Sequence, residues 1–199
     1  MPTSSIIALT LALAAGQTVA GVRQLYDAGR YQDVVRAADQ VAAETDRAVR
    51  MQFLAAQSLA KLKDDGGARR AYLRLAESGE NPWGAIGKSA VQILDKQLDE
   101  ALASADQAVR EGGSVSEAHY QRGFVLMMRR DYGNAANAFA KAVQLDPTFA
   151  AAYYYAGLAN SRIKRIDLTA NNFEMFIKLA PNAPERPEVE SILRTIRGR

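Results

Sequence analysis

The sequence predicts an all-α fold in which helix–turn–helix units repeat along the chain and one further helix closes the array. The 199 residues are rich in Ala and Leu and contain only six prolines, a composition that favours helix over strand. Two stretches of the chain match each other at an offset of 34 residues, which is the length of a helix pair in a repeat array. The C-terminal residues carry an apolar stripe with helical spacing.

The repeat is clearest where residues 116–149 align with residues 150–183. The shared features are a small residue in each helix, an aromatic residue in the second helix and a proline after it. The small residues allow two helix backbones to approach closely, the aromatic fills the space between one unit and the next, and the proline ends the second helix. The aligned pairs are Gly123 and Gly157, Ala135 and Thr169, Phe139 and Phe173, and Pro147 and Pro181.

This pattern resembles the tetratricopeptide-repeat (TPR) family, whose repeat has 34 residues. The resemblance is weaker upstream of residue 116. In residues 49–79, the spacing is kept by Ala56, Ala68 and Tyr72, without a proline in phase. In residues 80–115, Gly87 and Ala101 fit the two small positions, but they lie two residues further apart than Gly123 and Ala135. We therefore expect two extra residues in the turn of that unit.

The resemblance implies a right-handed α-solenoid of about five TPR-like units. Their expected bounds are about 21–48, the most degenerate unit, then 49–79, 80–115, 116–149 and 150–183, followed by a capping helix at 184–199. In that last segment the apolar residues fall at helical spacing, as a helix that covers the final interface of an array requires. They are Val189, Ile192, Leu193 and Ile196.

The first 20 residues predict either a signal peptide or an apolar first helix. Ile6–Ala15 reads IIALTLALAA, the length of a signal-peptide core and too short for a stable membrane span. Small residues follow it, but no Lys or Arg precedes it. A cleaved signal would place the mature protein in the periplasm or outside the cell, without a transmembrane anchor, whereas an uncleaved first helix would leave it in the cytoplasm.

Charge and composition narrow the function classes. The 25 basic and 22 acidic residues give a net charge of +3 and are spread along the chain, whereas a nucleic-acid binder is expected to carry a basic stripe. Nucleic acid is thus not the favoured partner, although the Arg69-Arg70 and Arg129-Arg130 pairs keep RNA or polyanion binding as an alternative. The absence of cysteine excludes disulfides and cysteine-ligated metal.

No catalytic constellation is visible. The one histidine, His119, aligns with Tyr153 in the repeat, so packing in a first helix explains it better than a triad or a metal site. Phosphate-binding glycine motifs are missing from the sequence. We predict no enzyme activity, no cofactor and no metal ion. An enzyme would require a pocket that brings together catalytic groups for which the sequence shows no motif.

In a TPR solenoid the first helix of each unit lines the concave groove, so the resemblance assigns a partner-binding site. The side chains at these positions are mostly aromatic or apolar, which favours an apolar or amphipathic polypeptide segment as ligand. The Lys, Asn and Arg of the TPR clamp for a terminal carboxylate are replaced here by residues such as Leu54 and Gln121. The predicted groove residues are Phe53, Gln57, Tyr120, Phe124, Met127, Tyr154, Tyr155 and Leu158.

The sequence therefore predicts a non-catalytic protein–protein interaction scaffold, acting in envelope or secretion-related assembly. Some of the groove aromatics could instead pack between units. Self-association through the groove, as a homo-oligomeric structural module, is a second alternative. Fold alone does not name the partner.

Overall fold

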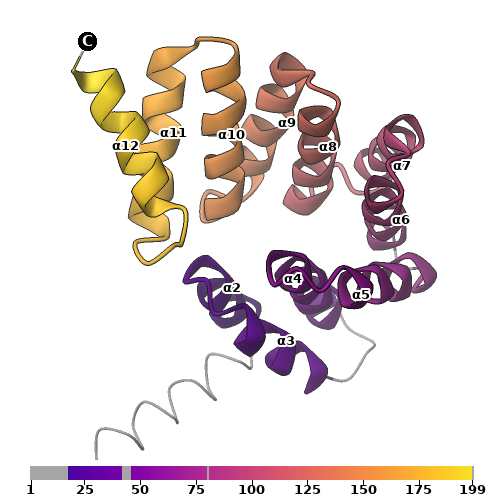
Figure 1. Ribbon diagram of the computed structural model, residues 1–199. Coiled ribbons are helices and arrows are strands. Elements are labelled where there is room, and N and C mark those ends of the chain that lie inside the picture. Colours follow the sequence, from indigo (N-terminus) through magenta and orange to yellow (C-terminus); the bar gives the residue numbers. More distant parts are fainter. Residues whose placement is uncertain (1–17, 42–45, 80, 199) are drawn as a thin grey trace, which may run out of the picture. The chain divides into compact units, whose positions relative to one another are not determined.

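The computed structural model describes residues 18–41, 46–79 and 81–198, and their regular secondary structure is entirely α-helical (Figure 1). The predicted signal-peptide core lies outside these residues. The chain divides into two compact units, Met1–Tyr72 and Leu73–Arg199. In the described part of the chain no helix is long and apolar enough to cross a membrane.

The first unit contains the first helix pair and most of the second. Thr18 begins the first helix, because its hydroxyl accepts a hydrogen bond of 3.0 Å from the backbone N–H of Gly21, as an N-cap residue does. The buried side chains include Val22, Val34 and Met51, which come from three different helices. These helices are α2 (Val19–Asp27), α3 (Tyr31–Asp39), α4 (Asp46–Lys61) and α5 (Asp65–Glu77), the last of which continues into the second unit.

The second unit contains three further helix pairs and a terminal helix, and within it successive helices pack on one another (Figure 1). The helices are α6 (Trp83–Leu94), α7 (Leu98–Glu111), α8 (Ser116–Met128), α9 (Tyr132–Leu145), α10 (Ala150–Arg162), α11 (Ile166–Leu179) and α12 (Arg186–Arg197). The predicted all-α fold of successive helix pairs with a final helix is confirmed. On α12, Val189 and Leu193 are buried in one cluster with Phe173 and Phe176 of α11, so the helix caps the last pair.

The turn inside each helix pair is the same structure repeated. One residue in it takes a left-handed conformation with φ between 60° and 73°, and this residue recurs every 33 or 34 positions: Gly29, Lys63, Lys96, Arg130 and Lys164. The left-handed residue reverses the chain within three residues, so that the second helix can pack against the first. This conformation is uncommon for residues other than glycine, and no glycine marks it in four of the five turns.

The repeated turn corrects the expectation for residues 80–115. Three residues separate α6 from α7, as three separate α8 from α9, so the turn holds no extra residues. Counted from this turn, Ser89 rather than Gly87 occupies the place in α6 that Gly123 occupies in α8. Ser89 is fully buried there, and its hydroxyl donates a 2.9 Å hydrogen bond to the backbone carbonyl of Ala101 in α7.

Candidate functional site

A glycine and an aromatic ring define the crossing of the two helices in each of the two clearest repeats. A Cβ atom on Gly123 would lie 2.8 Å from the ring of Phe139, and one on Gly157 would lie 2.5 Å from the ring of Phe173. Both rings are completely buried. Of the other predicted repeat positions, Ala56, Ala68, Tyr72, Ala101, Ala135 and Gly87 are buried, whereas Pro147 and Pro181 are exposed just after α9 and α11.

The predicted groove residues lie in both units of the chain. Phe53 and Gln57 belong to α4 of the first unit and are buried. The other six lie in the second unit, on its neighbouring first helices α8 and α10. Tyr120, Phe124 and Met127 belong to α8, and Tyr154, Tyr155 and Leu158 to α10. The structure thus brings these six together on two adjacent helices.

Tyr155 and Tyr120 join one helix pair to the next. The ring centroid of Tyr155 lies 5.3 Å from that of Phe124, 5.8 Å from that of Tyr120 and 5.7 Å from that of Phe139. Tyr120 is only 2% exposed and stacks on Phe149 at 4.8 Å. Offset and edge-to-face ring pairs of this kind each add about 0.5–1.5 kcal/mol beyond area burial. These two tyrosines therefore act first as packing residues between repeats.

The other four predicted groove residues on α8 and α10 form a surface that is accessible to solvent. Phe124, Met127, Tyr154 and Leu158 are each partly exposed, and we call these four residues the aromatic face. Phe124 and Leu158 hold equivalent positions in successive repeats, and Met127 follows Phe124 at the spacing that keeps side chains on one side of a helix. The fourth member, Tyr154, packs against Phe176 at 5.2 Å, which holds its ring in place.

Tyr154 also reaches the terminal helix. Its hydroxyl donates a long hydrogen bond of 3.4 Å to Oε2 of Glu188 on α12. Burial of the phenol, together with the negative charges of Glu188 and Glu185, raises the pKa of Tyr154 far above its ordinary value. The phenol therefore stays neutral and remains a hydrogen-bond donor at physiological pH.

A buried polar chain that was not predicted from the sequence connects α8 to the preceding helix pair. The Gln121 amide donates to Oγ of Ser89 at 3.1 Å, which in turn donates to the backbone of α7. Next to it, Ser116 donates to Glu117 at 2.9 Å, and both of these residues are buried. The signal in the sequence was a single Ser, at a position where the next two repeats have Gly123 and Gly157, and a single Gln, at a position where the next repeat has Tyr155.

Several arginines are engaged within the chain. Arg122 Nε lies 2.6 Å from a carboxylate oxygen of Asp106, and Arg129 Nη2 lies 3.0 Å from Asp99, so both join α8 to α7. The guanidinium of Arg162 lies 5.9 Å from the ring centroid of Tyr132. Partly exposed ion pairs of this kind contribute less than about 1 kcal/mol each. They engage Arg129, one member of the Arg129-Arg130 pair that kept polyanion binding open.

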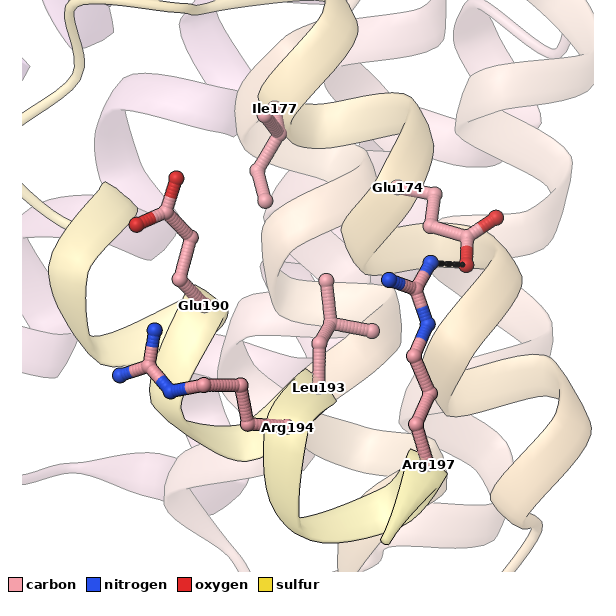
Figure 2. Close-up of a pocket in the computed structure, with 6 residues that line it drawn as sticks. All are labelled: Glu174, Ile177, Glu190, Leu193, Arg194 and Arg197. Carbon is pink, nitrogen blue, oxygen red and sulfur yellow. Dashed lines mark hydrogen bonds and ion pairs between the residues drawn. The ribbon is translucent and has the colours of Figure 1, made fainter.

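A cavity of about 500 Å³ lies between α11 and α12 (Figure 2). Ile177 and Leu193 provide its apolar lining, and charged side chains surround them. The acids in it are neutralised internally: Arg197 Nη2 lies 2.6 Å from Glu174, and Arg186 Nε lies 2.7 Å from Glu190. The cavity is lined by Glu174, Ile177, Glu190, Leu193, Arg194 and Arg197, and none of them was predicted as a site residue.

Among the described residues no three His, Cys, Asp or Glu side chains gather as a metal site. His119 lies near the start of α8, where its Nε2 is 3.0 Å from the backbone carbonyl of Gly113. Burial lowers the pKa of His119 below its ordinary value of 6.5, and Lys141 and Arg122 add to this effect, while the Gly113 carbonyl opposes it. At neutral pH the imidazole of His119 is therefore mainly uncharged.

This environment predicts a pH dependence of stability. Because the pKa of His119 is lower in the folded protein, the unfolded chain takes up a proton first as pH falls through about 6.5. The free energy of unfolding should be constant just above neutral pH and should decrease between pH 6.5 and pH 5. Denaturant titrations over this range measure it, and the decrease should vanish in His119→Gln, since the chain has no other histidine. An unchanged decrease in the variant would contradict this assignment.

Comparison with known proteins shows which proteins share this arrangement of helices. Residues 116–149 match the family model for the tetratricopeptide repeat. The chain is similar in structure to a thermophilic TPR protein from Thermus thermophilus, with a TM-score of 0.63 and 17% identity over 89% of this chain and 96% of that one. A search of curated proteins finds no match.

Two other similar structures are described with peptides. YrrB, described as a TPR protein with an unusual peptide-binding site, has a TM-score of 0.53 and 19% identity over 87% of this chain and 90% of its own. The first TPR of Spaghetti (RPAP3), bound to the HSP90 peptide SRMEEVD, has a TM-score of 0.53 and 18% identity over 57% of this chain and 88% of its own. Residues 116–149 therefore match one tetratricopeptide repeat, and the chain shares the fold of these TPR structures.

Proposed function

We propose that this protein is a non-catalytic scaffold that binds an apolar or amphipathic polypeptide segment on the aromatic face of its second unit. The observation that carries the proposal is the partial exposure of Phe124, Met127, Tyr154 and Leu158 on the neighbouring helices α8 and α10. A row of apolar side chains held on two rigid helices suits the apolar side of a bound segment.

Two of the similar structures support a peptide as the ligand. TPR structures similar to this chain include one with a peptide-binding site and one bound to a peptide. The chemistry of the face favours an apolar ligand over a terminal carboxylate, because the amide of Gln121 donates to Ser89 and the neighbouring Tyr120 is buried among rings. Neither residue offers a cation to a carboxylate.

The size of the face is compatible with modest affinity. Fully burying a large apolar side chain contributes about 1.5–3 kcal/mol. The four residues of the aromatic face are already partly buried, so each adds only a fraction of this, and association itself costs several kcal/mol. We expect dissociation constants of about micromolar, which suits a reversible assembly or recruitment step.

The double variant Met127→Ala and Leu158→Ala tests this proposal. It should weaken the binding of a labelled amphipathic helical peptide about tenfold or more, because two side chains that the peptide would cover are truncated. Fluorescence anisotropy measures the affinity, and circular dichroism checks that helix content is kept. The matched control is Ile166→Ala with Leu168→Ala, which truncates two exposed apolar residues on α11.

Equal losses in the two double variants, or no loss in the first, would show that the binding face lies elsewhere. Either result would indicate that the peptide binds to other exposed apolar residues or to the first unit. A protein that bound no peptide of this class would contradict the proposal as a whole.

We further propose that the scaffold acts after export, in envelope or secretion-related assembly. Support comes from the apolar stretch Ile6–Ala15 and the small residues that follow it. Cell fractionation of the full-length protein tests this, with N-terminal sequencing of the product. An uncleaved chain recovered only from the cytosol would overturn the location and leave the binding proposal intact.

A further inference from the structure

The carboxylate of Glu188 lies at one end of the aromatic face and differs in its contacts from Glu190, the other acid of α12. Glu188 occupies the place in α12 that Tyr154 occupies in α10, exactly one repeat earlier, and it is exposed. Among the described residues it accepts a hydrogen bond from the Tyr154 hydroxyl, at 3.4 Å, and forms no ion pair. A carboxylate held by a single long, neutral hydrogen bond retains its capacity to accept from a cation.

The nearest cation on the same helix does not neutralise it. Arg186 is directed to Glu190, at 2.7 Å, and to the backbone carbonyl of Pro181, at 2.8 Å. At the cavity shown in Figure 2, Glu190 of α12 pairs with Arg186, and Glu174 of the neighbouring helix α11 pairs with Arg197. The acids on the cavity side of α12 are therefore paired with arginines, whereas Glu188 faces Tyr154 and has no arginine partner among the described residues.

The surroundings of Glu188 combine charge with aromatic and apolar surface. The Tyr154 ring lies next to it, and Leu158 and Ile192, which hold equivalent positions in α10 and α12, are both partly exposed. A lysine or arginine side chain fits such a place, because its alkyl part packs on apolar surface and its charged end reaches a carboxylate or a ring face. An acidic ligand at this place would be repelled by the Glu188 carboxylate.

We propose that the segment bound on the aromatic face is a basic amphipathic one. Its apolar side covers Phe124, Met127 and Leu158, and a lysine or arginine at its edge pairs with Glu188 beside Tyr154. This inference rests on the proposed function and adds the sign of the partner's charge.

The attraction between Glu188 and a basic segment acts only over a short distance. The whole chain carries a net charge of +3, so its overall field weakly repels a basic ligand. That field is screened beyond roughly 8 Å at physiological ionic strength, whereas a cation in contact with Glu188 is within a few ångströms of it. The preference for a basic segment should therefore come from contact with this carboxylate.

Two labelled helical peptides with the same apolar pattern test the inference, one with lysine and the other with glutamate at its polar positions. Fluorescence anisotropy of the full chain at about 0.1 M salt should show tighter binding of the lysine peptide by about tenfold, since the glutamate peptide loses an ion pair and gains a repulsion. Glu188→Gln should weaken binding of the lysine peptide about threefold, the range of a partly exposed ion pair. The control Glu190→Gln, on the same helix but directed to Arg186, should leave both affinities unchanged.

The outcomes separate this inference from the proposed function. Equal affinity for the two peptides, or an affinity for the lysine peptide that Glu188→Gln does not change, overturns the inference while peptide binding still stands. Absence of binding by either peptide overturns both.

Discussion

Phe139→Ala should lower the free energy of unfolding by about 3–5 kcal/mol, the usual cost of truncating a buried phenylalanine to alanine. The ring is completely buried in α9. It packs on Tyr120 and Tyr155, each with centroids at 5.7 Å, and against the backbone of Gly123. The cavity would therefore open among three helices, α8, α9 and α10, where close neighbours on each side limit collapse. Guanidinium titration followed by circular dichroism at 222 nm measures the change.

Two controls separate this effect from a general loss of aromatic surface. Phe139→Leu keeps most of the volume and should cost less than about 1.5 kcal/mol. Phe124→Ala removes a ring of the same kind from the partly exposed aromatic face, so its cost should be clearly smaller than that of Phe139→Ala. Equal costs for Phe124→Ala and Phe139→Ala would mean that Phe139 does not hold the two helix pairs together.

The fold was predictable because two successive repeats mark their helix crossing in the same way. Gly123 and Phe139 recur as Gly157 and Phe173, and a ring can reach the neighbouring helix only where the facing residue is small. The first helix of the third pair was placed two residues out of register, at Gly87 in place of Ser89, because this pair carries Ser89 and Ala105 at these positions. The turn that would have given the register was invisible, since Lys96 and Lys164 adopt a left-handed conformation that their side chains do not signal.

The candidate site was predicted in outline only. Repeat positions place Tyr120 and Tyr154 on the same side of their helices, but they do not say what covers each side chain. Tyr120 is buried because Phe149, at the start of the next pair, stacks on it. The link between Gln121 and Ser89 joins residues 32 positions apart, and the charge of Glu188 became informative only when its neighbours were known. The signal-peptide core, outside the described residues, stays a prediction.

Gly157→Leu should be the other strongly destabilising change, with a loss of about 3 kcal/mol or more in the free energy of unfolding. Even the first added carbon would lie 2.5 Å from two atoms of the Phe173 ring, well inside van der Waals contact. That ring is completely buried among close neighbours, so we expect α10 and α11 to be forced apart. Thermal and guanidinium unfolding of the variant measure the loss.

Gly133→Leu is the matched control, because it makes the same change in the first turn of α9, where a Cβ would meet nothing within 4 Å. There the gain in helix propensity, up to about 1 kcal/mol, should leave the protein as stable as before or slightly more so. A double-mutant cycle then identifies the cause at Gly157. If the clash is with the ring, Gly157→Ala should cost less when Phe173 is already leucine, because the shorter side chain leaves room for the added methyl group. Additive costs would instead place the strain in the α10 backbone, and the pairing of glycine with the aromatic would not be what sets the helix crossing.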